Sequence, residues 1–152
     1  MDKLIVHCSD SGFGTVDDID RWHKERGWKG VGYHFVITNG VSSSGKYYRQ
    51  KHDGVIQPGR SAKKSGAHCR GHNTTSLGIC LIGKEHFSDA QRISLLALTL
   101  DLCGSYSLGA DRVYGHYEFD DGKSCPNLNM AVFRDDLSFR LQRMQTKENQ
   151  ND

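Results

Sequence analysis

The chain lacks a hydrophobic run long enough to cross a membrane or to direct export. A transmembrane helix needs about 20 apolar residues, whereas the longest apolar-rich stretch, residues 93–102, contains a serine, a threonine and an aspartate. The N-terminus passes from Met1-Asp2-Lys3 directly into the short run Leu4-Ile5-Val6, without the basic segment and apolar core of a signal peptide. We therefore expect no membrane insertion, and synthesis in the cytoplasm without a signal peptide.

An excess of charge of one sign is also missing. The sequence has 20 Lys and Arg against 18 Asp and Glu, a formal net charge of +2. Proteins that bind nucleic acids through their phosphates need a concentrated basic surface. We therefore expect no nucleic-acid partner, and any attraction to an anionic polymer has to be local.

Paired cysteines are the third absence. The cysteines are odd in number, at positions 8, 69, 80, 103 and 125, and no export signal accompanies them. This pattern favours reduced thiols over a disulfide framework. The eight histidines are the unusual count that remains, because histidine and cysteine bind metals and histidine transfers protons.

Apolar strands alternate with amphipathic helices along the 152 residues, a length that suits one domain. The predicted strands lie at 4–8, 32–37, around 47–48, 77–83 and 112–116. Two predicted helices begin at the capping boxes Thr15/Asp18 and Ser88/Gln91, and they end at Gly27 and Gly104 respectively. A third helix is predicted from the apolar stripe 133–144. We predict one α/β domain over residues 1–144, with a mixed sheet of about five strands and helices on both faces. Residues 145–152 are expected as a polar tail, and 41–54 as a polar hairpin-like excursion.

Three residues fall where an α/β sheet forms its sites, at strand ends and in the loops beyond them. His7 ends the first predicted strand, His116 ends the last, and Cys125 follows in a loop. Two imidazoles and a thiolate would make a three-ligand zinc site with one open position, as in catalytic zinc centres. Because none of them lies in a tightly spaced pair, a core histidine, a surface histidine and a buried cysteine remain the alternative. A cysteine hydrolase that uses Cys125 with His116 is a second alternative.

Further residues allow a chemical and an ordinary interpretation. Lys123 would stabilise an oxyanion or simply be solvated, and Tyr33 would hydrogen-bond the reacting water or be a half-buried strand tyrosine. The tract 65–73, with His68 and Asn73, would bind metal by composition or form a polar rim. Cys8 and Cys80 lie in apolar runs and are interpreted as small buried side chains.

Several segments in one order resemble a known family. They are Ile5–Ser9, Arg21–Trp28, Val31–Phe35, Ala67-His68 with Asn73, Ser76–Gly83, Gly115–Glu118 and Lys123–Pro126. This pattern is similar to the zinc-dependent N-acetylmuramoyl-L-alanine amidases, which include phage endolysins and are related to peptidoglycan recognition proteins. The resemblance implies that one zinc ion is bound by His7, His116 and Cys125, that Tyr33 and Lys123 are catalytic, and that His68 and Asn73 bind substrate.

The resemblance also implies a reaction and a partner. The expected activity is hydrolysis of the amide between N-acetylmuramic acid and L-alanine of peptidoglycan, by a monomeric phage or prophage endolysin that reaches the wall after release or delivery. Some recognition proteins of this fold only bind peptidoglycan and lack the zinc thiolate, whereas Cys125 is present here. The other alternative is a phage regulatory protein of the same fold that also binds RNA polymerase.

Overall fold

The computed structural model describes residues 1–42 and 47–148. It contains one five-stranded sheet with the strand order β3-β2-β4-β1-β5. The strands are β1 (Lys3–Cys8), β2 (Phe35–Val41), β3 (Tyr48–Pro58), β4 (Ser76–Leu81) and β5 (Val113–Gly115). The helices are α1 (Val16–Glu25), α2 (Asp89–Tyr106) and α3 (Met130–Glu148), with short 3-10 turns η1 (Ala110–Arg112) and η2 (His116–Glu118).

The sheet is mixed, as predicted. β1 pairs in parallel with β4 and β5, β2 pairs in parallel with β4, and β3 is antiparallel to β2. β1 and β4 are buried along almost their whole length, because strands pair on both sides of each and helices cover both faces of the sheet. The register pairs Val6 with Gly115. His7, which is still in β1, and His116, which begins the turn after β5, therefore lie side by side.

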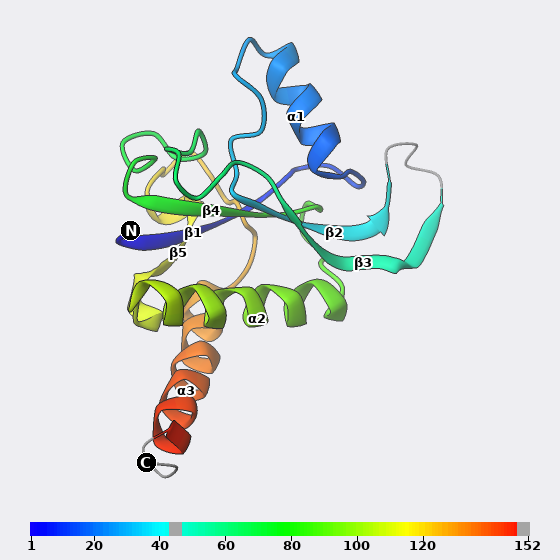
Figure 1. Cartoon of the computed structure of the whole chain (residues 1–152). Coiled ribbons are helices and arrows are strands. Elements are labelled where there is room, and N and C mark those ends of the chain that lie inside the picture. Colours follow the sequence, from blue (N-terminus) through cyan, green and yellow to red (C-terminus); the bar gives the residue numbers. More distant parts are fainter. Residues whose placement is uncertain (43–46, 149–152) are drawn as a thin grey trace.

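Helices cover both faces of the sheet, which confirms the predicted layers. Figure 1 shows α1 on one face, α2 across the other, and α3 beyond α2 with its C-terminal end pointing away from the sheet. The larger core packs Leu4, Leu77 and Leu81 against Leu95 and other buried leucines. The smaller core lies beneath α1. Because burying one such side chain contributes about 1.5–3 kcal/mol, these two layers hold the sheet rigid.

Both predicted capping boxes are present. The Asp18 backbone N–H donates to Thr15 Oγ1 and the Thr15 N–H donates to Asp18 Oδ2, at 3.3 and 2.9 Å. Ser88 and Gln91 make the same reciprocal pair at the start of α2. Gln91 Nε2 also donates to the carbonyl of Ile37. One glutamine thus starts α2 and attaches it to β2.

Several predicted boundaries were wrong. The second strand was predicted at 32–37 but spans Phe35–Val41. β3 is eleven residues long and largely exposed. Because its sequence is polar, the apolar pattern did not predict this edge strand. α2 continues past Gly104 to Tyr106, and the left-handed residue Ser107 caps its C-terminus. The Leu108 N–H donates to the Cys103 carbonyl there. α3 runs to Glu148, so the first four residues of the expected polar tail are helical. Residues 43–46 of the predicted excursion and 149–152 of the tail lie outside the described residues.

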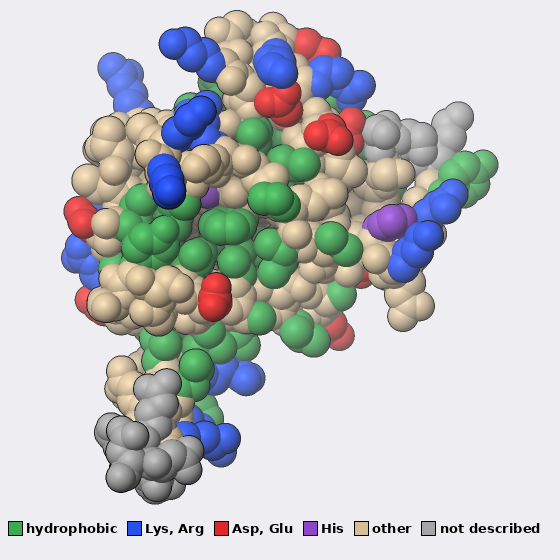
Figure 2. All heavy atoms as spheres, viewed as in Figure 1, with side chains coloured by type: hydrophobic (Ala, Val, Ile, Leu, Met, Phe, Trp, Pro, Cys, Tyr) green, Lys and Arg blue, Asp and Glu red, His purple; other side chains and the backbone are tan. Residues whose placement is uncertain are grey.

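Across residues 1–42 and 47–148, no helix has the length and apolar character required to span a membrane. Figure 2 shows acidic and basic side chains mixed around α1 on the viewed face, in keeping with the nearly balanced charge. Hydrophobic side chains on that face gather over the sheet and α2.

Candidate metal centre and groove

The three predicted metal ligands meet at the carboxyl end of β1 and β5. One ligand atom from each of His7, His116 and Cys125 lies within 4.8 Å of the other two. The His7 and His116 rings are 4.5 Å apart between centroids. His7 is buried, and the other two are partly exposed to the groove. Two imidazoles and a thiol at this separation fit a tetrahedral Zn²⁺ with one side open.

An ion pair between Glu118 and Arg134 of α3, which we call the buttress, stabilises the turn that carries His116. Glu118 Oε1 accepts the Gly115 backbone N–H at 2.8 Å. Arg134 Nη1 donates both to Glu118, at 2.8 Å, and to the Val113 carbonyl, at 3.0 Å. The guanidinium therefore joins α3 to β5 and to the turn that carries His116.

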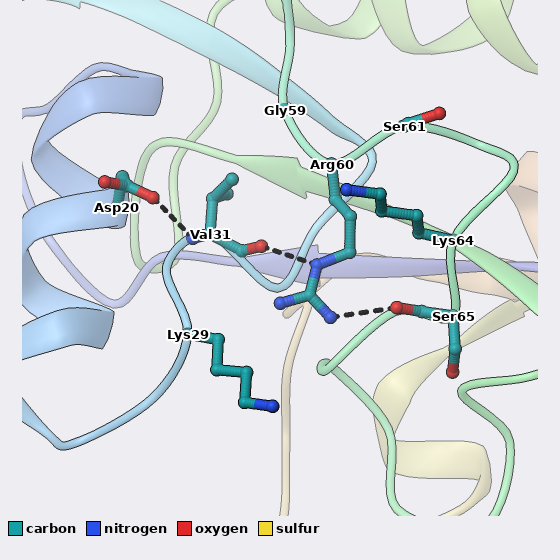
Figure 3. Close-up of a pocket in the computed structure, with 8 residues that line it drawn as sticks. All are labelled: Asp20, Lys29, Val31, Gly59, Arg60, Ser61, Lys64 and Ser65. Atoms are coloured by element: carbon teal, nitrogen blue, oxygen red, sulfur yellow. Dashed lines mark hydrogen bonds between the residues drawn. The ribbon is translucent and has the colours of Figure 1, made fainter.

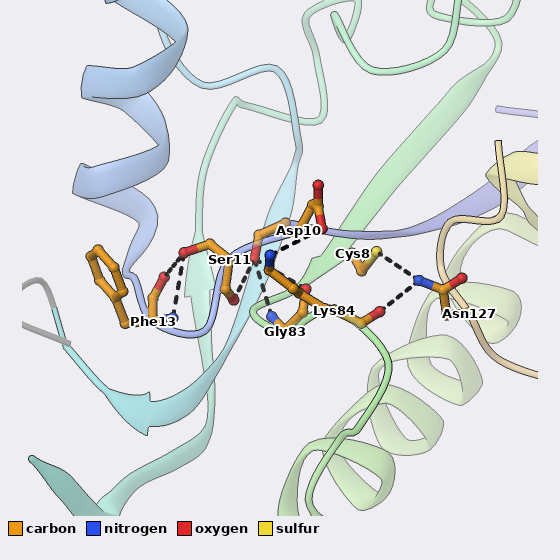
Figure 4. A network of polar contacts seen from close by, with 8 residues as sticks. Cys8, Asp10, Ser11, Phe13, Gly83, Lys84 and Asn127 are labelled. Carbon is orange, nitrogen blue, oxygen red and sulfur yellow. Dashed lines mark hydrogen bonds and ion pairs between the residues drawn. The ribbon is translucent and has the colours of Figure 1, made fainter. Parts of the chain in front are cut away.

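Cys125 is held against the end of β1. The Cys8 backbone N–H donates to Cys125 Sγ at 3.1 Å, the type of contact that stabilises a thiolate ligand. Asn127 Nδ2 contacts Cys8 Sγ at 3.8 Å and donates to the Lys84 carbonyl at 2.6 Å, and Lys84 faces Asp10 (Figure 4). The loops after β1, after β4 and before α3 are thereby tied together around the two cysteines.

The electrostatics of this cluster suit a cation. A hydrogen bond with the Cys8 thiol and then burial raise the pKa of the Cys125 thiol, because both favour its protonated form. Burial is the main cause that lowers the pKa of both His7 and His116, so both rings are neutral at pH 7. Neutral imidazoles are the form that binds metals, and a divalent cation would favour the Cys125 thiolate. The donor set present therefore fits zinc.

Tyr33 and Lys123 line the same groove, which has a volume of about 810 Å³. The Tyr33 ring lies 5.0 Å from the His7 ring. Burial, and then the thiols of Cys80, Cys125 and Cys8, hold the pKa of Tyr33 well above its ordinary value. Tyr33 is therefore a neutral hydroxyl that can donate a hydrogen bond but is not a general base. Lys123 is exposed at the rim, and its charge acts to lower the pKa of His116.

His68 and Asn73 also line the groove, but their contacts are within the protein. His68 Nδ1 is 2.9 Å from His7 Nε2. Asn73 Oδ1 accepts the backbone N–H groups of His68 and Cys69, at 2.8 and 2.9 Å. Burial, followed by the neighbouring His34, lowers the pKa of His68 to about 3. The interpretation of 65–73 as a polar rim thus misses that His68 contacts a candidate ligand.

A second pocket concentrates positive charge outside the metal cluster. Its walls carry Lys29, Arg60 and Lys64, together with Asp20 (Figure 3). Arg60 Nε donates to the Val31 carbonyl at 3.0 Å. Asp20 accepts the Val31 N–H and pairs with a lysine of α1. In a chain of net charge +2, this pocket is a local concentration of positive charge.

Some residues that build the site carry no signal in the sequence. Cys8 acts through its backbone N–H, which any residue offers, and its neighbour Cys125 is 117 positions away. Glu118 and Arg134 form an ion pair of a common type. Its role is recognisable only from its position beside the turn that carries His116. Gly78 has the ring of His68 against its Cα. Such roles arise from tertiary contacts.

Acid is expected to destabilise the fold through two buried histidines. Burial lowers the pKa of both His23 and His34, and each accepts a backbone N–H at Nδ1, from Gly32 and from Gly78, at 3.0 Å. Unfolding restores their ordinary pKa of about 6.5, so the unfolded chain binds more protons below that pH. The contribution of these two histidines to the free energy of unfolding should be flat above pH 6.5 and then fall, by up to about 1.4 kcal/mol per pH unit for each histidine.

Urea unfolding between pH 7.5 and 5.0 measures this slope. His34→Asn keeps an acceptor for the Gly78 N–H and removes one titrating group. Its slope should be shallower than that of the wild type. An identical slope in the variant would show that His34 does not contribute.

Comparison with known proteins finds one family of sequences similar to this chain. The sequence profile of the N-acetylmuramoyl-L-alanine amidase family matches residues 1–128. The chain is 34% identical over 140 residues to the endolysin of Escherichia phage T7, covering 85% of this chain and 82% of that protein. It is 33% identical over 140 residues to the endolysin of Klebsiella phage KP32, covering 84% and 82%.

A solved structure has a similar fold. N-acetylmuramoyl-L-alanine amidase LysC from Clostridium intestinale superposes with a TM-score of 0.72 at 26% identity. The superposition covers 93% of this chain and 85% of LysC. The structural similarity therefore extends over nearly all of the chain.

Proposed function

Because this chain belongs to the N-acetylmuramoyl-L-alanine amidase family, we propose that its peptidoglycan amidase activity depends on one zinc ion bound by His7, His116 and Cys125. The observation that carries the proposal is the meeting of these three side chains, within 4.8 Å, on the wall of the groove. A bound zinc ion would supply Lewis acidity toward the scissile carbonyl and would lower the pKa of water.

The protein side chains around that position have separate tasks. The buttress of Glu118 and Arg134 keeps His116 in place. The neutral Tyr33 hydroxyl would donate a hydrogen bond to the reacting water or the carbonyl oxygen, because burial raises its pKa and keeps it protonated. The Lys123 ammonium would lie near the oxygen that becomes negative as the amide carbonyl is attacked. The amine of L-alanine would then leave with the proton that the attacking water gives up.

Lys123→Ala should lower kcat by about 10²-fold, because it removes one cation that stabilises the developing oxyanion. Zinc content should not change, since Lys123 is not among the three proposed ligands. Lys63→Ala, an exposed lysine outside the groove, is the matched control. Steady-state hydrolysis of a muramyl peptide and metal analysis measure both properties. A Lys123→Ala enzyme with wild-type kcat would contradict the role.

We propose a substrate that includes the muramyl group and its stem peptide, recognised within the groove. His68 and Asn73 line its wall, and their role as substrate contacts stays a prediction; the contacts of His68 with His7 and Ser76 leave it no free ring nitrogen. The relatives are endolysins, and we propose that this chain likewise acts on the wall after release from the cytoplasm or delivery. A monomeric state and the lack of a nucleic-acid partner stay predictions. The comparisons give no support to the alternative of a regulatory protein that binds RNA polymerase.

Mass spectrometry of digested peptidoglycan tests the bond that is cut. Free stem peptides that begin with L-alanine are the expected products. New reducing-end sugars would instead indicate a glycosidase. The digestion should stop with a chelator and resume when zinc is added back; continued digestion in chelator would refute the zinc proposal while leaving the amidase assignment intact.

A further inference from the structure

We propose that His68 is a positioning residue that holds His7 in one tautomer, with the proton on Nε2 and Nδ1 free for the metal. The inference rests on the proposed zinc site and adds a function for a histidine outside the three ligands. It also differs from the predicted role of His68 as a substrate contact.

The hydrogen-bond chain behind His7 has one consistent direction. The Ser76 hydroxyl donates to the His72 carbonyl at 2.7 Å, which uses its only proton. Ser76 Oγ is 3.4 Å from His68 Nε2, so at this contact it can only accept, and His68 carries its proton on Nε2. His68 Nδ1 is then an acceptor. At 2.9 Å it receives the Nε2 proton of His7.

This direction determines which His7 nitrogen remains. A neutral imidazole has one N–H, so a proton on Nε2 leaves the Nδ1 lone pair unprotonated. With Nε2 engaged by His68, Nδ1 is the atom that His7 offers toward His116 and Cys125. Metal-bound histidines commonly donate their second N–H in this way, which sets the tautomer and the orientation of the ring.

The structure also prevents His68 from turning away. A Cβ on Gly78 would lie 2.6 Å from His68 Cγ, and a Cβ on Gly66 would contact the same ring, so the imidazole occupies space that only two glycines leave open. Asn73 Oδ1 holds the backbone of His68 through two N–H groups. Both ring nitrogens already have partners in the protein. Binding substrate through His68 would break this chain.

Nitrogen NMR of the zinc-loaded protein tests the tautomer directly. Long-range ¹H–¹⁵N spectra of histidine-labelled protein report which His7 nitrogen carries a proton and which binds metal. The expected result is a protonated Nε2 and a metal-bound Nδ1. Metal bound at Nε2 would overturn the inference. This measurement needs no variant, so it stands even if substitutions at position 68 fail to fold.

Zinc affinity of variants tests the consequence. His68→Ala removes the acceptor and should weaken zinc binding about 10- to 100-fold in competition with a chromophoric chelator. His68→Asn places an amide oxygen near the position of Nδ1 and should recover most of that affinity. His86→Ala, an exposed histidine, should bind zinc like the wild type. A Co²⁺-substituted His68→Ala protein should show an altered visible spectrum, which a role in packing alone would not produce.

The outcomes separate this inference from the proposed function. If the wild type binds no zinc, or binds it independently of Cys125, the zinc site itself fails. If the wild type binds zinc through Cys125 but His68→Ala retains full affinity and an unchanged Co²⁺ spectrum, only the role of His68 fails. Equal loss in His68→Ala and His68→Asn would also contradict it, because the second variant keeps an acceptor.

Discussion

Cys125→Ser should reduce peptidoglycan hydrolysis by at least about 10³-fold and abolish stoichiometric zinc binding. The substitution replaces the only proposed thiolate with a hydroxyl that stays protonated at neutral pH and is a poor zinc ligand. The two remaining imidazoles would hold the metal weakly, and the Lewis acid would be lost from the groove. Turbidity loss of cell walls and metal analysis of the purified variant measure the two effects together.

Ser105→Ala is the control, since Ser105 is exposed on α2 and does not line the groove. It should keep both zinc and activity. The alternative of a cysteine hydrolase using Cys125 with His116 also predicts an inactive Cys125→Ser. That enzyme would, however, remain active in chelator and lose activity on thiol alkylation. Zinc dependence, with bound metal protecting Cys125 from alkylation, distinguishes the proposed mechanism.

Gly78→Ala should give a large loss of stability, about 3 kcal/mol in the free energy of unfolding. Gly78 lies in β4, paired with Ile5 of β1, so the backbone cannot move aside without disturbing the centre of the sheet. The new methyl group would lie 2.6–2.8 Å from three atoms of the His68 ring. Overpacking of this kind costs about 1–3 kcal/mol. We place Gly78→Ala at the upper end because the displaced ring also loses its bond to His7.

Gly104→Ala provides a control of opposite sign. Gly104 lies in the last turns of α2, where a Cβ would meet no atom within 4 Å. Removing the flexibility of glycine from a helix stabilises it by about 0.5–1 kcal/mol. Urea unfolding should therefore give changes of opposite sign for the two substitutions. Equal effects would mean that the His68 ring does not occupy the space next to Gly78, and zinc affinity of Gly78→Ala checks the same point.

Local signals in the sequence predicted the parts of the fold that depend on local physics. The capping boxes at Thr15 and Ser88 predicted where α1 and α2 begin, because a hydroxyl and an acceptor three residues on satisfy the first helical N–H groups. The same reasoning missed most of β3, since a polar edge strand is stabilised by pairing with β2 and has no apolar pattern of its own. It also ended α2 too early at Gly104.

The residue types of the candidate metal centre were visible in the sequence, but their arrangement was not. Composition and the family resemblance identified His7, His116 and Cys125 as candidates, and the sheet register then brought the first two together through the pairing of Val6 with Gly115. His68 was predicted at the groove, yet its bond to His7 spans 61 positions of the chain.

The sequence by itself determined the buried strands and the starts of α1 and α2, the near-balanced charge and the chemical groups available for a metal site, because these follow from side-chain type and local spacing. The tertiary structure decided which backbone N–H faces the Cys125 sulfur, how Arg134 secures the His116 turn, and which nitrogen of His7 is left for a metal. Those are contacts between distant segments. They depend on strand order and on the space left by Gly66 and Gly78, neither of which a local pattern encodes.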